Sequence, residues 1–259
     1  MEWTDEGIVL SARRHGESAA IVQLLTRGHG RHPGLVHGGA GARLRGMLQP
    51  GNRVQATWRA RLAEHLGTYS CELLHSGAAA LLDDALRLAA LAAACAVAEA
   101  ALPEREPHTA VFTGLAALIA AWESTDRIAG WGRALVQWEL GLLAELGFGL
   151  DLARCAATGR NDELAYVSPR TGRAVSLSAG EPYKDRLLPL PAFLVKAGAA
   201  AREDDILPGL ALTGHFLERH VFAGLHRSIP PARIHLLNRL RRALRGAGKL
   251  TTDTDCPRI

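Results

Sequence analysis

The feature that most constrains the fold is a change of sequence pattern at Ser76-Gly77. Before this point the chain consists of short aliphatic and β-branched runs separated by glycine. After it the chain is dominated by long segments rich in Ala and Leu, residues that favour helix. This order, strands first and helices second, predicts an α+β multidomain protein with an N-terminal β domain and a C-terminal helical domain.

Alternation of apolar and polar residues is clearest from Val54 to Leu62, where the period of two predicts a strand. Its apolar face includes Trp58, which we expect in the core, and its other face places Arg59 and Arg61 ~7 Å apart. The other predicted strands cover residues 7–13, 19–26, 34–37 and 67–74. Five short strands in the first 75 residues predict a small closed barrel of the OB (oligonucleotide/oligosaccharide-binding) type.

The second part of the chain reads as a helical domain with a small β element. Helices are predicted over residues 78–102, 109–122, 128–146, 191–201, 210–225 and 231–245. Between them, residues 164–168 and 174–177 flank the turn Pro169-Arg170-Thr171-Gly172 and predict a β-hairpin. The expected organisation is an OB-fold domain at 1–77, a helical domain at 78–249 with the β element at about 155–180, and a tail at 250–259.

Several protein classes are excluded by composition. A chain of 259 residues with 48% hydrophobic and 22% charged residues can bury a large core, which rules out disordered and disulfide-rich secreted classes. The acidic N-terminus MEWTDEGIVL is unlike a signal peptide, and no apolar run approaches the about 20 residues of a membrane span. We therefore expect a cytoplasmic protein with no membrane contact.

Charge is strongly segregated along the chain. Residues 13–61 hold nine arginines and one acid, and residues 219–249 hold seven arginines, one lysine and no acid. The stretch between them, 62–218, holds 12 basic and 20 acidic residues. Basic segments without interleaved acids attract polyanions, which predicts nucleic-acid binding. A coding bias is the alternative, since 27 of the 30 basic residues are Arg.

The last predicted helix is amphipathic. Its expected apolar face holds Ile234, Leu236, Leu237, Leu240, Ala243 and Leu244, and its cationic face includes Arg239, Arg241, Arg242 and Arg245. We expect this face to be a second DNA surface or a dock for an acidic peptide. The barrel residues expected to contact DNA are Arg13, Arg14, Arg27, Arg31, Arg43, Arg45, Arg53, Arg59 and Arg61.

No catalytic or cofactor motif is complete. The glycines at 38–41 lack the spacing of a P-loop or a dinucleotide site, and Gly16-Glu17-Ser18 lacks the closing glycine of a nucleophile elbow. The cysteines at 71, 95, 155 and 256 form no Cys-x-x-Cys pair. We therefore expect no enzyme activity, no catalytic residue, no metal and no cofactor.

Three long segments carry a resemblance to a known family. They are GIVLSARRHGESAAIVQLLTRGHGRHPGLVHGG, LQPGNRVQATWRARLAEHLGTY and LAYVSPRTGRAVSLSAGEPYKDRLLPLP. In sequence and order they resemble the bacterial RecO family of DNA repair proteins. The resemblance implies an N-terminal OB fold, a helical C-terminal domain, and a nucleoid-associated recombination mediator in the RecF pathway of homologous recombination after DNA damage.

The resemblance also implies partners. They are single- and double-stranded DNA, whose complementary strands the protein would anneal, RecR, the C-terminal tail of single-strand DNA-binding protein, and indirectly RecA. Many members carry a four-cysteine zinc motif, of which only Cys155 remains here, with Thr158 at the expected partner position. This departure again predicts a zinc-free protein.

The acidic tail of single-strand DNA-binding protein requires a cation beside an apolar groove. Arg127 and Arg133, which flank Trp131 near the start of a predicted helix, are the candidates. Two other functions stay open at this stage. An OB-fold RNA- or single-strand-binding module would bind without annealing or mediator activity, and a nuclease or hydrolase would need a catalytic cluster.

Overall fold

The computed structural model describes residues 1–196 and 198–246, and it confirms the five N-terminal strands. They are β1 (Glu2–His15), β2 (Ala19–Thr26), β3 (Gly30–Val36), β4 (Arg53–Arg59) and β5 (Thr68–His75). Hydrogen bonding runs in the order β1-β2-β3-β5-β4, and β4 pairs back to β1, so the sheet closes into a barrel. A short helix that the sequence analysis missed, α1 (Ala42–Met47), lies between β3 and β4.

Alternation along β4 fills the barrel as predicted. Val54, Ala56 and Trp58 are buried, and the indole N–H of Trp58 donates to the Leu66 carbonyl at 2.9 Å. Gly67, at φ 63°, passes against the Trp58 ring where a side chain would collide with it. The predicted extension of the strand to Leu62 is wrong, because pairing ends at Arg59 and Leu62 is 46% exposed.

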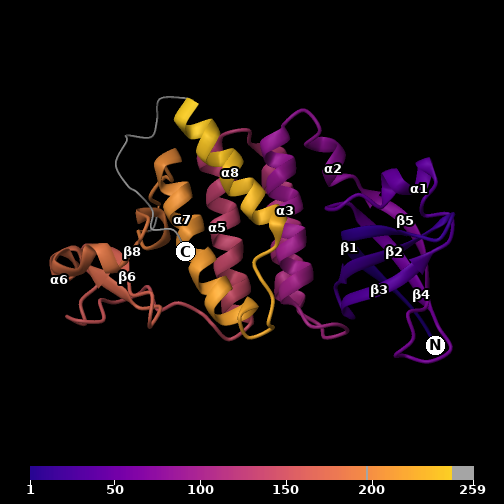
Figure 1. Ribbon diagram of the computed structural model, residues 1–259, viewed down its shortest axis with the longest axis horizontal. Helices are drawn as coiled ribbons and strands as arrows, with labels where there is room; N and C mark the ends of the chain where they lie inside the picture. Colours follow the sequence, from indigo (N-terminus) through magenta and orange to yellow (C-terminus); the bar gives the residue numbers. More distant parts are fainter. Residues whose placement is uncertain (197, 247–259) are drawn as a thin grey trace.

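Helices form the centre of the molecule and the barrel lies at one end (Figure 1). The helices are α2 (Gly77–Ala80), α3 (Ala85–Ala101), α4 (Thr109–Ser124), α5 (Ile128–Glu145), α7 (Ile206–Phe216), the π-helical η4 (Leu217–Phe222) and α8 (Pro231–Gly246). The single helix predicted over 78–102 is wrong. Asp84 interrupts it, because its carboxylate accepts from the backbone N–H groups of Leu86 and Arg87 and so caps a new helix.

The predicted hairpin is confirmed at the opposite end of the molecule from the barrel (Figure 1). Its strands are β6 (Leu164–Val167) and β7 (Ala174–Ser176), and a third strand, β8 (Leu188–Pro189), adds to β6. The short helices α6 (Leu177–Gly180) and η1 (Glu181–Arg186) connect β7 to β8. Sequence patterning missed β8, since two residues are too short for a periodic signal.

The helix predicted over 191–201 is wrong. Only the single 3-10 turn η2 (Ala192–Leu194) forms among the described residues of this stretch, and Gly198 adopts a positive φ of 76° that a helix does not accommodate. A second such turn, η3 (Glu203–Asp205), precedes α7. The predicted tail, 250–259, lies outside the described residues.

Helix α3 packs against the outside of the barrel. Ile8 and Leu25 are paired across β1 and β2, and with Leu10 they join the hydrophobic core of the helical region. The inward-facing neighbours Val9 and Leu24 belong to the barrel's own core. The outer face of β1 and β2 is therefore part of the contact between the two regions. No described helix combines the length and apolar character needed to cross a membrane.

Candidate nucleic-acid interface

The outer face of β1, β4 and β5 is a polar surface organised in rows. Because residues opposite each other in an antiparallel pair share a face, the register places Glu2, Arg59 and Thr68 in one row. The next row holds Thr4, Thr57 and Ser70, and a third holds Glu6, Gln55 and Glu72. We refer to these nine residues as the row face.

The acidic side chains Glu2 and Glu6 of the row face pair with arginines of the barrel. Glu2 accepts a hydrogen bond from Arg59 at 2.9 Å, which lowers the pKa of Glu2. Glu6 contacts both Arg53, whose Nε lies 2.7 Å from the carboxylate, and Arg27 at 3.1 Å. Two carboxylates therefore pair with three of the nine barrel arginines, and one positive charge is left over in this group.

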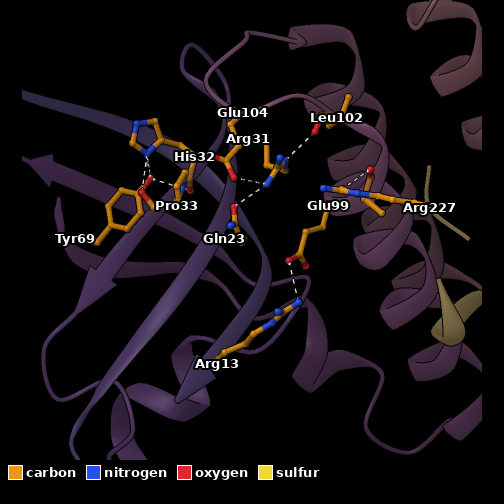
Figure 2. A network of polar contacts seen from close by, with 11 residues as sticks. Arg13, Gln23, Arg31, His32, Pro33, Tyr69, Glu99, Leu102, Glu104 and Arg227 are labelled. Carbon is orange, nitrogen blue, oxygen red and sulfur yellow. Dashed lines mark hydrogen bonds and ion pairs between the residues drawn. The ribbon is translucent and has the colours of Figure 1, made fainter. Parts of the chain in front are cut away.

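Two more of these arginines are paired with acids of the helical region. Arg13 lies 3.5 Å from Glu99 of α3, and Arg31 lies 3.0 Å from Glu104 (Figure 2). Arg31 is only 9% exposed, and it also donates to the Leu102 carbonyl at 2.9 Å and to Gln23. Its guanidinium therefore joins the barrel to the helical region and does not lie on the exposed cationic surface.

The remaining four barrel arginines are exposed and have no acidic partner among the described residues. Arg14 donates to the backbone carbonyls of Gly16 and Glu17. Arg43 and Arg45 project from α1, and Arg61 lies in the loop between β4 and β5. These four side chains are the most available cations of the barrel.

The acids that pair with the other barrel arginines lie outside the basic segment 13–61, so the charge balance of that segment does not reveal them. Glu2 and Glu6 lie just before that segment, and Glu99 and Glu104 come from the helical region. One signal was present, since Glu2, Thr4 and Glu6 alternate at the period of a strand face.

A shallow hollow of about 310 Å³ opens between the row face and the end of β3. Its lining consists of His37, Thr57, Arg59, Thr68, Tyr69 and Ser70. The Tyr69 side chain is buried, with its hydroxyl 3.2 Å from the His32 carbonyl. The other polar groups of the lining are the hydroxyls of exposed Ser70 and half-buried Thr57 and Thr68, the Arg59 guanidinium and the His37 imidazole.

Helix α8 presents the second group of predicted arginines. Arg241, Arg242 and Arg245 are exposed, and Arg239 is partly covered where it donates to the Ala85 carbonyl at 2.9 Å. Leu236, Leu240 and Leu244 are buried as predicted. The predicted apolar face is wrong at Ile234, which is 50% exposed, and at Ala243, which is also exposed.

Arg233 is buried on the inner side of α8, although the predicted apolar face did not include it. Its guanidinium makes two hydrogen bonds to Glu139 of α5, at 2.7 and 2.8 Å, and also contacts the Leu210 carbonyl and the Thr213 hydroxyl of α7. Both members of the ion pair are 2% exposed. This network fixes α8 against two helices and so orients its cationic face.

The three predicted peptide-binding residues do not form one exposed cluster. Arg127 is exposed at the start of α5, but Trp131 is 1% exposed and belongs to the core, so its assignment to a peptide groove is wrong. Arg133 is turned toward Phe193 and donates to the Ala199 carbonyl at 3.2 Å. An apolar groove of about 370 Å³ lies instead between α4 and α5, lined by residues that include Gly114, Leu118 and Trp138.

The residues around Cys155 do not fit a four-cysteine zinc site. Burial raises the pKa of the Cys155 thiol, but hydrogen bonds from Ser176 and Thr158 lower it to about 6 overall. Its sulfur lies 3.2 Å from the Ser176 backbone nitrogen. Among the described residues, no three His, Cys, Asp or Glu side chains are grouped as metal ligands.

Comparisons with known proteins agree with this architecture. Residues 1–76 match the family model "Recombination protein O N terminal", and residues 82–229 match "Recombination protein O C terminal". The chain is 61% identical to the DNA repair protein RecO of Rhodospirillum centenum over 94% of this chain and 96% of that protein. It is 55% identical to the RecO of Phenylobacterium zucineum over 94% and 99%. The chain therefore belongs to the RecO family, and its role lies in DNA repair and recombination.

Proposed function

We propose that this protein is a recombination mediator that binds single- and double-stranded DNA without sequence preference and anneals complementary strands. With RecR, it would help to load RecA onto single strands covered by single-strand DNA-binding protein. The observation that carries the proposal is that exposed arginines without an acidic partner among the described residues occur in two separate regions, the barrel and α8. The strand order β1-β2-β3-β5-β4, with a helix between β3 and β4, supports the OB type.

Binding would depend on phosphate contacts more than on base stacking. The large aromatic side chains of the barrel are mostly engaged within it, since Trp58 and Tyr69 are buried and Trp3 stacks on His29 at 4.0 Å. Exposed arginines, by contrast, are available on α1, in the β4–β5 loop and on α8. Such a surface is expected to bind any sequence, with an affinity that falls steeply as salt rises.

Annealing follows from having two cationic surfaces on one body. Two complementary strands repel each other through their phosphates, and a protein that holds one strand on the barrel and the other on α8 screens this repulsion. No bond is made or broken in this role, so it requires no catalytic residue and no cofactor.

The groove between α4 and α5 supports a site for the tail of single-strand DNA-binding protein. It offers apolar walls for the last residues of such a tail, and Arg127, exposed at the start of α5, offers a charge for its acidic part. In this proposal the groove replaces Trp131 as the apolar component of the site.

The test is fluorescence anisotropy of a labelled ~30-nucleotide single strand across a salt series, followed by addition of its complement. A mediator gives tight binding at low salt, a linear fall of log affinity with log salt, and faster annealing than the DNA alone. Preference for RNA without annealing would favour an RNA-binding module. Absence of binding at low salt would refute the assignment of the arginines to DNA.

A further inference from the structure

The hollow beside β4 and β5 combines groups that suit a phosphate better than a base. Thr57 lies opposite Ser70, and Arg59 lies opposite Thr68, so four polar side chains form a compact square on one face of the sheet. All four line the hollow, with His37 at its edge. Hydroxyl and guanidinium groups are the usual donors to phosphate oxygens in protein–DNA contacts.

The floor of the hollow offers no surface on which a base could stack. Tyr69 is 5% exposed and its ring lies within the barrel, where Trp3, His32 and the Tyr69 hydroxyl contact one another. A ligand in the hollow would therefore meet hydroxyl groups and Arg59, whichever base it carried.

In the structure, the Glu2 carboxylate forms an ion pair with the guanidinium of Arg59. The carboxylate lies at the far side of Arg59 from Thr68, in the same row, and both partners are largely exposed, at 53% and 68% of their side chains. An exposed pair of this kind contributes little to stability and exchanges readily for another anion. A phosphate in the hollow could thus displace the carboxylate.

Other acids limit the direction of a bound strand. Glu6 and Glu72 occupy the third row, beyond Thr57 and Ser70, whereas Arg61 follows Arg59 on the opposite side. A polyanion is repelled from the third row and attracted toward the exposed Arg61 side chain.

We propose that the hollow is a phosphodiester subsite for single-stranded nucleic acid, in which Arg59 supplies the charge and Thr57, Thr68 and Ser70 donate hydrogen bonds. Glu2 is an internal competitor that holds Arg59 until the phosphate replaces it. This inference rests on the proposed single-strand binding and locates one part of it.

Two matched variants test the role of the hydroxyls. Thr4 and Thr57 share a hydrogen bond at 2.9 Å, so T4V and T57V both break it, but only Thr57 lines the hollow. We expect T57V to weaken binding of a ~30-nucleotide oligothymidylate at least about threefold, because a hydrogen bond to a charged phosphate is lost. T4V should stay within about twofold of the wild type.

Substitutions that remove the charge of Glu2 or of Arg59 test whether Glu2 competes with the phosphate for Arg59. E2Q is expected to tighten binding about fivefold by releasing Arg59, and R59Q to weaken it about tenfold. Adding E2Q to R59Q should then have no further effect, since Glu2 acts through Arg59. The T57V effect should persist on an oligonucleotide whose central residues are abasic, because the contact is to phosphate.

The outcomes separate this inference from the proposed function. The subsite is refuted, and DNA binding left intact, if the wild type binds the oligonucleotide but T57V and T4V bind it with equal affinity. The same conclusion follows if E2Q does not bind it more tightly than the wild type. Wild-type protein that does not bind the oligonucleotide at low salt would overturn both. Thermal unfolding of each variant identifies any loss of affinity that comes from loss of fold.

Discussion

Two arginines show how the same residue type serves different purposes in this chain. Arg31 and Arg233 both fall in segments that sequence analysis assigned to the cationic surfaces, yet both are buried against carboxylates. Their partners, Glu104 and Glu139, are 73 and 94 residues away along the chain. A charge pattern read along the sequence cannot reveal such pairs, because they form only when the elements pack.

The buried pair of Glu139 and Arg233 is expected to be important for stability. Replacing Glu139 with Ala leaves a buried guanidinium without its counter-charge, which should lower the free energy of unfolding by about 3–5 kcal/mol. Urea denaturation followed by circular dichroism measures this loss.

The exposed pair of Arg160 and Asp162 supplies the control for this measurement. Their side chains are 75% and 54% exposed, so Asp162→Ala should change the free energy of unfolding by less than about 1 kcal/mol. Equal effects of the two substitutions would contradict the importance assigned to the buried pair.

His32 is expected to make the stability of the barrel pH-dependent. Burial lowers the pKa of His32 from an ordinary value of 6.5 to about 4. The unfolded chain therefore binds more protons than the folded one between these two values, and stability falls as the pH drops from about 6.5 toward 4. At pH 5 the loss from this residue is about 2 kcal/mol relative to pH 7.5.

Urea unfolding of the wild type and of H32Q at pH 7.5 and pH 5 measures this contribution. Glutamine does not titrate, so the variant should lack about 2 kcal/mol of the drop. An identical drop in both proteins would show that other groups account for the acid sensitivity.

At the scale of elements, periodicity identified most strands and helices but not their ends. The β4 pattern and the long helices α4, α5 and α8 were predicted because each presents a regular apolar face. The break at Asp84 and the two-residue strand β8 depend on local capping and on pairing with β6, and neither gives a periodic signal. The buried face of α8 differs from the predicted one because Arg233 lies on it, whereas Ile234 and Ala243 are exposed.

Helix α8 should be needed for annealing more than for single-strand binding. Reversing Arg241 and Arg242 to Glu changes the charge of its exposed face without touching Leu236, Leu240 or Leu244. We expect annealing of complementary oligonucleotides to be abolished and single-strand affinity to change by less than about threefold, since the barrel is intact. Fluorescence energy transfer between labelled complements measures the annealing rate.

A control with the same change in net charge is available on η1. Lys184 and Arg186 are exposed on this turn, which directly follows α6, and α6 lies apart from α8 (Figure 1). Their reversal to Glu should leave annealing unaffected. If the two double variants slowed annealing equally, overall charge and not α8 would be responsible.

At the scale of the whole molecule, the sequence predicted the two kinds of structure but not how they meet. The change of pattern at Ser76-Gly77 does separate the five barrel strands from the long helices of the second region. It could not show that α3 covers the outer side of β1 and β2, because a strand with apolar residues on both faces has the same sequence pattern whatever covers it.

This contact makes the barrel dependent on the helical region. A fragment of residues 1–77 would expose Ile8, Leu10 and Leu25, which are at most 2% exposed in the full chain. We expect the fragment to bind the dye ANS (8-anilinonaphthalene-1-sulfonate) strongly and to self-associate, as measured by fluorescence and sedimentation. The same fragment with these three residues changed to Thr should bind less dye, and equal binding would contradict the prediction.

The pairing of Glu2 with Arg59 has a consequence for how DNA binding is measured. An arginine that exchanges a carboxylate for a phosphate leaves that carboxylate to gather a cation from solution, and this uptake offsets the cations that the DNA releases. The slope of log affinity against log salt therefore reports the number of cations released by the DNA minus the number taken up by the protein. If Arg59 binds phosphate as proposed, we expect the slope to give fewer phosphate contacts than the strand makes, and removing Glu2 to bring the two numbers closer together.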